Sequence, residues 1–468
     1  MMKKRIQLIR TLAAAGLLAS LLLCGGCALA QRRPLALSPE SDVPATGLPD
    51  RATDAPCAPE EPPPPTVEEL LSLYGAYLPD AIDAQTLRWL EEQTEEGGFL
   101  DALAVCGASD PDALRGEYWW YAHTGMTLRV IADLSGGAQS DNLHILADTS
   151  GARTVTLAFT GDVCLDDSWS NMVQYYRMGA DIENNVSLSL LETLRGADIT
   201  LINNEFCYSL RGSPTPAKYY TFRADPANVE IMLSLGADIV SLANNHCHDF
   251  GADAFADTLE TLRNAGLPYV GAGADRAEAE QVQYYIAGGM KIAYIACTRA
   301  EKFILTPEAG EHSGGVFRTY DPTRALEVIS EAAEAADYVI VYPHWGTENT
   351  TVLEDVQLEL ARLYAEAGAD LIVGGHPHCL QGIDFVGDCP VFYSLGNFWF
   401  NANPGTTAVL YAELSYADGL SPRLIPCTQL AGVTADASGT PEGQAVLELL
   451  AGLSPNVSIA EDGRVLRK

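Results

Sequence analysis

Short, continuous hydrophobic runs alternate with longer amphipathic segments from residue 154 onward. Such runs are typical of buried strands, and apolar residues three or four positions apart are typical of helices. The alternation predicts an α/β fold with largely parallel strands covered by helices. The predicted strands are 154–160, 198–203, 238–243, 292–297, 337–342 and 369–374. The predicted helices are 225–235, 252–265, 322–336 and 354–368.

Antiparallel elements are expected beside this parallel core. Residues 281–297 and 380–398 each have a Gly-Gly or Gly-Asp turn signal between two hydrophobic runs, which is typical of a hairpin. Residues 406–428 contain two further strand candidates, and residues 442–453 have the pattern of a helix. The core is therefore expected to be α/β with antiparallel additions.

The first 30 residues have the pattern of an export segment. Basic residues are followed by an apolar stretch, residues 11–23, and then by small residues that precede Cys27. Cys27 is the expected lipidation site of a lipoprotein. An uncleaved membrane helix and complete secretion are the alternatives. Each of them places the remainder of the chain outside the cytoplasm, and an anchor would hold it at the outer face of the cell membrane.

Composition divides the rest of the chain into four parts. Residues 31–65 are rich in Pro and acidic residues and are expected to form an extended linker. Residues 66–150 combine a helical pattern with strand-like runs, which predicts a small accessory α+β module. Residues 151–435 form the expected main domain, and residues 436–468 a C-terminal helix and tail.

The charge of the chain restricts its partners. With 28 Lys+Arg against 62 Asp+Glu, the formal net charge is −34. So acidic a chain offers no broad basic face, and nucleic acid is not an expected partner. An anionic substrate would need local cations, and bound metal ions are the natural candidates. The 11 cysteines include no CxxC pair beyond the export segment, which argues against a structural zinc site.

Metal-competent side chains follow five of the predicted strands. Ligands gather at the carboxyl ends of strands in open α/β sheets, so these side chains are expected to meet. A lone Asp or His at a strand end is ordinary, but five of the eight histidines lie at three strand ends. Carboxylate, imidazole and amide oxygen together suit Mn, Fe or Zn. The clusters are Gly161-Asp162, Asn203-Asn204-Glu205, Asn244 to Asp249, His344-Trp345-Gly346 and His376-Pro377-His378.

In this order, and with Glu348 and the segment 394–398, the clusters resemble the CapA family of poly-γ-glutamate capsule proteins. The resemblance spans about residues 154–430. The family is similar to the calcineurin-like metallophosphoesterases. The resemblance therefore implies a four-layer α/β/β/α sandwich of metallophosphoesterase type and a role in capsule biosynthesis.

The resemblance also implies two divalent metal ions, which would be Mn, Fe or Zn. Asp162 and His378 would bind the first ion, and Glu205 would bridge the two. Three further residues would bind the second ion, namely Asn245, His344 and His376.

Catalytic and substrate-binding roles follow from the same resemblance. His246 would act as the acid, and Asp249 would orient it. Arg223 and Asn397 are candidate substrate contacts. Arginine binds carboxylate or phosphate well, so an anionic substrate could also be bound by Arg211, Lys218 or Arg299.

Two positions depart from the general phosphoesterase pattern. That pattern has Asp-x-His in its first motif, whereas here Asp162 is followed by Val163 and Cys164. One imidazole ligand is therefore missing or is supplied by another residue. Glu205 replaces the bridging Asp and moves that carboxylate by one methylene group.

Three functions remain open at this point. The first is a metal-dependent hydrolase or transferase that acts on a phosphoester or on the γ-glutamyl polymer during capsule assembly. The second is a non-catalytic capsule assembly or polymer-binding subunit. The third is a surface phosphoesterase or nucleotidase. The expected partners are an anionic polymer or phosphoester, the membrane through the N-terminal anchor, and capsule synthase subunits.

Overall fold

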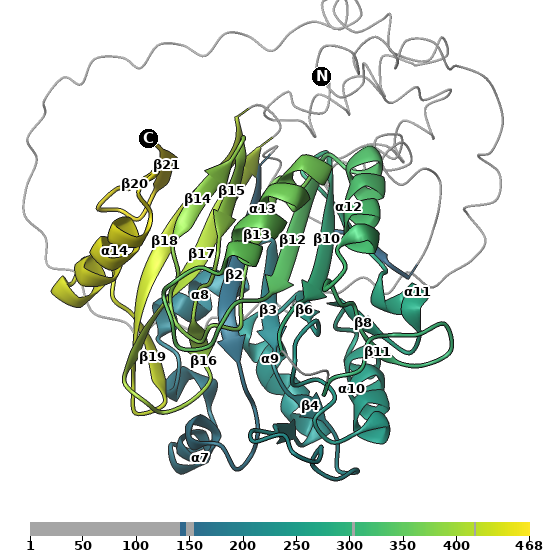
Figure 1. Ribbon diagram of the computed structural model, residues 1–468. Helices are drawn as coiled ribbons and strands as arrows, with labels where there is room; N and C mark the ends of the chain where they lie inside the picture. The colour runs from purple at the N-terminus through teal and green to yellow at the C-terminus, as the bar shows by residue number, and fades with distance from the viewer. Residues whose placement is uncertain (1–140, 147–153, 302–304, 416–417) are drawn as a thin grey trace, which may run out of the picture. The chain divides into compact units, whose positions relative to one another are not determined.

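The computed structural model describes residues 141–146, 154–301, 305–415 and 418–468 (Figure 1). The predicted export segment with Cys27, the linker 31–65 and nearly all of the module 66–150 lie outside these residues. The last part of that module is described, and it forms strand β1 (Leu143–Ile145), which pairs in parallel with β9 (Gln283–Ala287) of the main domain. Every helix in the described ranges is too short or too polar to cross a membrane.

One sheet has eight strands in the order β19-β18-β17-β2-β3-β6-β7, and β16 pairs with the end of β2. Strands β2, β3, β6 and β7 are parallel neighbours, whereas β17, β18 and β19 are antiparallel. The bounds are β2 Thr154–Val163, β3 Ile199–Asn204, β6 Ile239–Ser241, β7 Tyr269–Val270, β16 Asn397–Trp399, β17 Gly405–Ser415, β18 Gly419–Leu430 and β19 Val433–Asp436.

The other sheet has seven strands in the order β1-β9-β10-β12-β13-β15-β14. Its centre, β10-β12-β13-β15, is parallel, and the antiparallel pairs β9–β10 and β14–β15 flank it. The remaining bounds are β10 Met290–Thr298, β12 Tyr338–His344, β13 Leu371–Val373, β14 Ile383–Val386 and β15 Cys389–Phe392. Three small pairs complete the described strands: β4 Cys207–Tyr208 with β5 Arg223–Ala224, β8 Ala272–Gly273 with β11 Gly315–Val316, and β20 Val457–Ile459 with β21 Val465–Arg467.

The longer helices lie beside the sheets (Figure 1). α12 and α13 pack against each other and on the seven-stranded sheet, whereas α8, α9 and α10 accompany the eight-stranded sheet. The helices are α7 Ser170–Arg177, α8 Leu188–Gly196, α9 Val229–Leu235, α10 Ala252–Ala265, α11 Arg276–Ala279, α12 Thr323–Ala335, α13 Asp355–Ala367 and α14 Pro441–Leu453, with the 3-10 turns η1 Ile182–Asn184 and η2 Pro226–Asn228.

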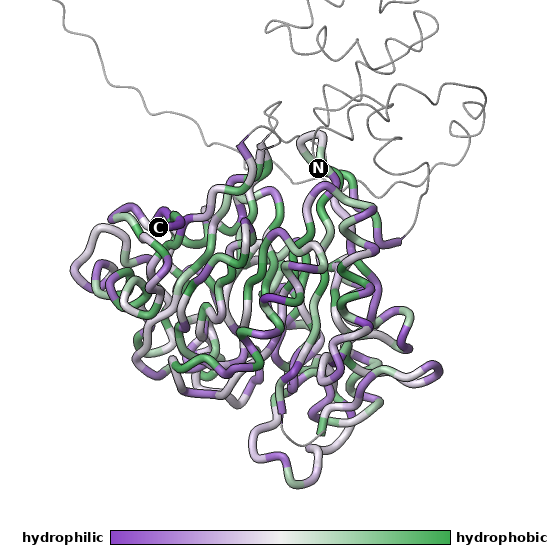
Figure 2. The backbone as a smooth tube through the Cα atoms, turned by 45° about the horizontal axis from the view of Figure 1, so that its top comes forward, coloured by the Kyte–Doolittle hydropathy of each residue, from purple (hydrophilic) through white to green (hydrophobic). Residues whose placement is uncertain are grey.

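Strand alternation separates the hydrophobic residues into distinct cores. Successive side chains point to opposite faces of a strand. On β10, Tyr294 therefore packs between the two sheets, where its ring centroid lies 6.4 Å from that of Phe159 on β2. Its neighbour Ile295 packs outward with Ile329 of α12 and Tyr364 of α13. Figure 2 shows the resulting pattern, with hydrophobic residues in the interior strands and hydrophilic residues in many of the outer loops.

The structure confirms the α/β class and most of the predicted elements. The helix predicted at 252–265 matches α10, and the glycines after α9, α10 and α13 have positive φ, as helix-ending residues do: 97° at Gly236, 64° at Gly266 and 118° at Gly368. The helix predicted at 225–235 is in fact the turn η2 followed by α9, because Pro226 begins a separate 3-10 turn.

The hairpin predicted at 380–398 is wrong at its C-terminal end. Strands β14 and β15 do form a hairpin at residues 383–392. The chain then leaves this sheet, and β16 pairs in parallel with β2 of the other sheet. This crossing brings the segment around Asn397 to the end of β2, where Asp162 lies.

Candidate metal centre

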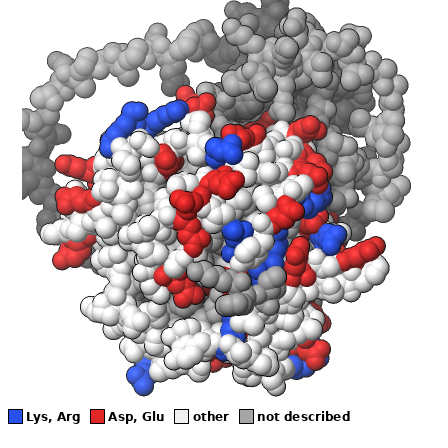
Figure 3. Space-filling view, in the orientation of Figure 1, with Lys and Arg blue, Asp and Glu red and all other residues white. Residues whose placement is uncertain are grey.

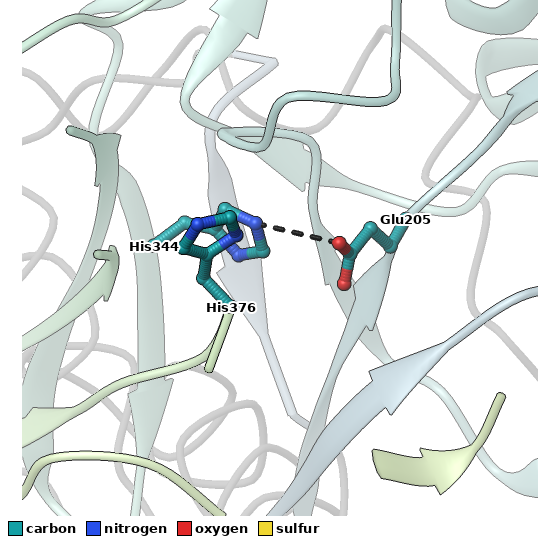
Figure 4. Close-up of side chains that lie close together, drawn as sticks. All are labelled: Glu205, His344 and His376. Atoms are coloured by element: carbon teal, nitrogen blue, oxygen red, sulfur yellow. Dashed lines mark ion pairs between the residues drawn. The ribbon is translucent and has the colours of Figure 1, made fainter. Parts of the chain in front are cut away.

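Acidic and imidazole side chains from four strand ends meet between the two sheets. Asp162 lies in the last part of β2, Glu205 directly follows β3, His344 ends β12, and His376 follows β13. The imidazoles of His344 and His376 lie with ring centroids 4.7 Å apart and face the carboxylate of Glu205 (Figure 4). Parallel strands end at the same edge of a sheet, which explains why residues distant in sequence meet here.

Glu205 occupies the centre of this group. Its side chain is fully buried, and its Oε1 atom has no hydrogen-bond partner among the described residues. Three imidazole nitrogens surround this oxygen: Nε2 of His344 at 3.5 Å, Nε2 of His378 at 3.8 Å and Nε2 of His246 at 4.0 Å. A buried carboxylate oxygen without a partner is costly unless a cation or a proton satisfies it.

The side chains form two groups with the composition of a metal site, and both include Glu205. One consists of Asp162, Glu205 and His378, and the other of Glu205, His344 and His376; in each group the potential ligand atoms lie within 4.8 Å of one another. Two atoms bound to one Zn²⁺ at about 2.1 Å lie roughly 3–4 Å apart, so the spacing fits a divalent ion. These residues therefore could bind metal at two adjoining positions that share Glu205.

Asp162 and His378 are held by neighbours outside the group. The backbone N–H of His376 donates to Oδ2 of Asp162 at 3.2 Å, and Nδ1 of His378 lies 3.3 Å from the same oxygen. Nδ1 of His378 also lies 2.9 Å from Oδ1 of Asn397, which can only accept. This contact favours a proton on Nδ1 and leaves Nε2, which faces Glu205, as the metal-binding nitrogen. Asn397, proposed from the sequence as a substrate contact, instead faces His378.

The second group includes an amide oxygen. Oδ1 of Asn245 lies 2.9 Å from Nε2 of His344, so both atoms point to the same region. His376 is buried, and its Nδ1 has no partner among the described residues. All six residues predicted as metal ligands are thus brought together, while their binding of metal remains a prediction.

The loop after β13 has unusual backbone geometry at these ligands. His376 and His378 have positive φ, 96° and 56°, a conformation that L residues seldom adopt. The residue before them is Gly375, where an added Cβ would lie 2.6 Å from Oδ1 of Asp162. A larger residue at this position would therefore have to displace the carboxylate of Asp162.

Asn203 belongs to one of the clusters at the strand ends, and the structure gives it a role that the sequence does not predict. Its Nδ2 donates to Oδ1 of Asp162 at 2.8 Å and to Oε2 of Glu205 at 3.2 Å. Asn244 fixes this orientation: its Oδ1 accepts from the N–H of His246, so its Nδ2 must donate, and the acceptor is Oδ1 of Asn203 at 3.2 Å. Asn203 is thus a donor that holds the two carboxylates, and its oxygen is directed away from them.

Burial governs the protonation of the site. Burial raises the pKa of Glu205 well above its usual value, and the negative charge of Asp162 adds to the effect. For Asp162 burial acts in the same direction, but the hydrogen bond and charge of His378 outweigh it and lower the pKa. Burial lowers the pKa of His344 to about 3 and that of His376 well below its usual value. Neutral imidazoles are the form that binds metal.

His246 and Asp249 form a buried pair beside the group. Nδ1 of His246 lies 2.7 Å from Oδ2 of Asp249, which also accepts from the N–H of Phe222 at 2.7 Å. Lys218 is nearly buried, and its Nζ lies 2.7 Å from Oδ1 of Asp249 and 2.9 Å from Oε1 of Glu301. Burial lowers the pKa of His246, although the charge of Asp249 opposes the shift. Asp249 thus orients the imidazole so that Nε2 faces Glu205, as the predicted roles require.

Cys164 does not replace the imidazole that is absent from the first motif. Its side chain is fully buried in the hydrophobic core beneath the eight-stranded sheet. Burial raises the pKa of this thiol well above its usual value, which disfavours the thiolate that a metal requires. Within the described ranges, the group around Asp162 therefore has one imidazole, from His378.

The four basic candidates differ in their surroundings. Arg211 is exposed and pairs with Asp257, and Lys218 is paired as described above. Arg223 lies over the ring of Phe250, 4.2 Å from its centroid, and its Nη1 donates to the backbone oxygen of Arg211. These contacts occupy Arg223 outside the carboxylate–histidine group, so the structure gives no support for its predicted substrate contact.

A pocket of about 410 Å³ opens next to the group. His376 and Asn245 line it, together with Arg299, Tyr320 and residues of the loop 346–354. Acidic side chains are spread over much of the face seen in Figure 3, and several Lys and Arg side chains lie among them. A small molecule, or the end of a polymer chain, can thus reach the candidate metal-binding residues through this pocket.

Comparison with known proteins agrees with this description. Residues 156–402, more than half of the chain, match the family described as bacterial capsule synthesis protein PGA_cap. The chain is 36% identical over 182 residues to the capsule biosynthesis protein CapA of Bacillus anthracis, which covers 38% of this chain and 44% of that protein.

Two further relatives give the same result. The PGA biosynthesis protein CapA of Bacillus subtilis is 36% identical over 175 residues, which is 37% of this chain and 45% of that protein. A probable polyglutamine synthesis accessory protein of Mycobacterium tuberculosis is 28% identical over 221 residues, 45% of this chain and 57% of that protein. The chain thus spans about half the length of these curated relatives. The match over most of the main domain confirms the resemblance of the motifs, and the chain belongs to the PGA_cap family of bacterial capsule synthesis proteins.

Proposed function

We propose that this chain is a metal-dependent hydrolase or transferase that acts on the poly-γ-glutamate polymer during capsule biosynthesis. The observation that carries the proposal is the buried Oε1 atom of Glu205, which has no hydrogen-bond partner in the described part of the chain and is surrounded by three imidazole nitrogens. The relatives named for capsule and PGA biosynthesis support the choice of polymer.

The proposal includes two ions and a phosphoesterase-like architecture. Glu205 would bridge, Asp162 and His378 would bind one ion, and the other would be bound by Asn245, His344 and His376. The two groups that share Glu205 support this assignment. The four-layer α/β/β/α arrangement of metallophosphoesterases is supported by two sheets in contact through a shared core and by helices packed on their other faces.

The chemistry divides between the ions and the protein. Bound divalent ions would polarise the carbonyl oxygen of the γ-amide and lower the pKa of a water molecule. Nε2 of His246 faces the same region. It would accept a proton from the attacking water and pass that proton to the departing nitrogen, while Asp249 holds the ring through Nδ1. Asn203 keeps the carboxylates of Asp162 and Glu205 in place.

Location is part of the proposal. Residues 1–30 would direct export, and Cys27 would carry the lipid that anchors the chain at the outer face of the membrane. The order of basic residues, apolar stretch and Cys27 supports this. Loss of membrane association in a Cys27→Ala protein would support the lipid anchor, and unchanged association would contradict it.

Elemental analysis and a substrate panel test the activity. The purified full-length protein should retain divalent metal, and a His376→Ala, His378→Ala double variant should lose it. The wild type should then shorten γ-linked polyglutamate, and the double variant should not. Protein that is metal-free after gentle purification, or inactive toward the polymer when loaded with Mn²⁺, would contradict the proposal.

A non-catalytic, polymer-binding role is the second candidate. Cys164 favours it, because it stands where the first motif of phosphoesterases has an imidazole, and it belongs to neither group of candidate metal ligands. Polymer binding without turnover in the metal-loaded protein would support this role. Turnover of phosphoesters but not of the polymer would instead support a surface phosphoesterase.

A further inference from the structure

Of the four basic candidates, Arg299 is the one that lines the pocket beside the candidate metal ligands. Arg211 and Lys218 pair with carboxylates, and Arg223 contacts Phe250 and a backbone oxygen outside the pocket. The guanidinium of Arg299 donates from Nη1 to the backbone oxygen of Tyr320 at 3.3 Å and lies 4.6 Å from the centroid of that ring. No carboxylate of the described residues lies within ion-pair distance of it. Arg299 is therefore a positioned cation that is available to an anionic ligand.

The position of Arg299 connects it to the metal centre. It directly follows β10, and its backbone N–H donates to the backbone oxygen of His344 at 2.9 Å. Its side chain lines the same pocket as Asn245 and His376. The ring of Tyr320 limits the orientations of the guanidinium, so it can bind a carboxylate with little loss of side-chain freedom.

The acidic residues of the pocket are not equivalent. Glu301 is neutralised by Lys218 at 2.9 Å and is 3.5 Å from Arg318. Glu354 is the N-cap of α13, where it accepts from the backbone of that helix and from the hydroxyl of Thr347.

Glu348 is exposed and has no ion pair among the described residues. Among the described residues, the pocket therefore presents one cation without an ion pair, Arg299, and one carboxylate without an ion pair, Glu348. This pair of charges suits a ligand with both a carboxylate and an ammonium group.

A γ-linked glutamate chain has such a group at one place only. In its internal units the α-nitrogen is part of an amide, so each unit carries only a negative α-carboxylate. The amino-terminal unit carries a free α-ammonium and an α-carboxylate on the same carbon. We propose that the pocket binds this amino terminus, with Arg299 at the α-carboxylate and Glu348 at the α-ammonium.

This inference rests on the proposed function, because it places the γ-amide of the terminal unit toward the metal centre. Hydrolysis there would break the C–N bond, add the hydroxyl of water to the carbonyl carbon and transfer the remaining proton to the departing nitrogen. The products would be free glutamate and a chain one unit shorter. An internal segment would instead place an uncharged amide at Glu348, so the attraction between the ammonium and that carboxylate would be lost.

The test compares two ligands by calorimetric titration of the full-length, Mn²⁺-loaded protein: a γ-linked glutamate tetramer and its N-acetylated form. Acetylation should weaken binding by about tenfold or more, since it removes the ammonium charge. Arg299→Gln should weaken binding of both ligands, and Arg299→Lys should restore part of it. Glu348→Gln should abolish the preference for the free amino terminus.

Matched controls are Arg362→Gln and Glu359→Gln on α13, both outside the pocket, which should bind as the wild type does. Metal content is measured for every variant, so that loss of metal is not mistaken for loss of ligand contact. Equal affinity for the free and acetylated tetramers, or unchanged binding in Arg299→Gln, would overturn the inference. Selective binding without hydrolysis would support the pocket assignment and contradict the hydrolase, whereas equal hydrolysis of both tetramers would contradict the pocket assignment alone.

Discussion

Acidic side chains lie at both ends of the parallel strands, and their surroundings differ. At the amino ends, four aspartates each precede a strand and accept a hydrogen bond from a backbone N–H of the neighbouring parallel strand. The pairs are Asp198 with Thr156 at 2.7 Å, Asp238 with Thr200 at 2.9 Å, Asp337 with Lys291 at 2.9 Å and Asp370 with Val339 at 2.8 Å. These aspartates tie adjacent strands together and have a structural role.

At the carboxyl ends the acids are surrounded by candidate metal ligands. Among the described residues, Oε1 of Glu205 has no hydrogen-bond partner. Asp162 accepts from Nδ2 of Asn203 and from the backbone N–H of His376, and its Oδ2 lies 3.3 Å from Nδ1 of His378. The same chemical group is thus structural at one end of the sheet and available to a cation at the other. Residue type alone does not separate the two roles, but position relative to strand direction does.

The largest effect is expected at the shared carboxylate. Glu205→Gln keeps the size of the side chain but removes the charge common to both groups. Retained metal should fall by more than about tenfold. Loss of a residue that merely hydrogen-bonds to a metal ligand already lowers metal affinity by at least about tenfold, and Glu205 is expected to bind the metal itself. Hydrolysis should fall with it. Elemental analysis and rate measurements at matched protein concentration check this.

Asp238→Asn is the control for that change, since it neutralises an acid at the opposite end of the sheet. It should retain wild-type metal. If Glu205→Gln retained as much metal as the wild type, or if both variants lost metal equally, the proposed difference between the two ends of the strands would be contradicted.

A smaller loss is expected from Asn397→Ala. This change removes the acceptor that holds Nδ1 of His378, 2.9 Å away, and so frees the orientation of the ring. Metal affinity should fall about 10- to 100-fold, as for other outer partners of ligating histidines. Competition with a metal-binding dye measures it, with the exposed Asn403→Ala as control. Unchanged affinity would show that His378 needs no such support.

A change at the amino ends of the strands should lower the stability of the fold and leave metal binding unchanged. Asp198→Ala removes the acceptor of both the N–H and the hydroxyl of Thr156. Unfolding free energy should fall by about 2 kcal/mol, since a partly buried donor loses its partner. Urea denaturation in the presence of chelator isolates this effect from metal binding. A loss of metal without a loss of stability would contradict the structural role.

The smallest effect is a dependence on pH. Burial raises the pKa of Asp370 to about 6, although the hydrogen bond from Val339 opposes the shift. The folded state thus holds this proton more tightly than the unfolded state, whose Asp pKa is about 3.9. Its contribution to stability is complete below pH of about 3.9 and is lost as pH rises through about 6.

Asp370→Asn is neutral at every pH and keeps an acceptor for Val339. It should match the wild type near pH 4 and be more stable by about 1 kcal/mol at pH 7.5, a value reduced for partial exposure. Urea denaturation at both pH values compares the two proteins. A stability difference that does not change with pH would refute the assignment.

Local pattern was sufficient for much of the fold. The 3.6-residue period of α10 and the hydrophobic runs of β2, β10 and β12 are continuous, so these elements could be predicted from residues close in sequence. α7 was not predicted because its buried positions include Asn171, whose amide is satisfied by backbone oxygens of Cys164 and Trp399. These hydrogen bonds depend on segments far away in the chain, so the buried Asn171 gives no hydrophobic periodicity in the sequence.

The same division holds at the site. The predicted ligands meet because parallel strands end at one edge, a rule that needs no knowledge of side-chain contacts. The donor role of Asn203 depends on Asn244, 41 residues away, and could not be predicted from local sequence. The sequence also does not distinguish Arg299 from the other three basic candidates, because its place in the pocket depends on how separate segments pack.

The placement of β2 has a consequence for the synthesis and folding of the protein. Asp162 is held by β3 on one side, while its other contacts come from the loop after β13, 214 residues later, and from β16. A growing polypeptide therefore cannot assemble the centre until about 400 residues have been made. Contacts between residues so far apart in the chain also slow folding. During export or chaperone binding, the N-terminal half of the domain therefore exists for a time with the carboxylates of Asp162 and Glu205 still without their histidine neighbours.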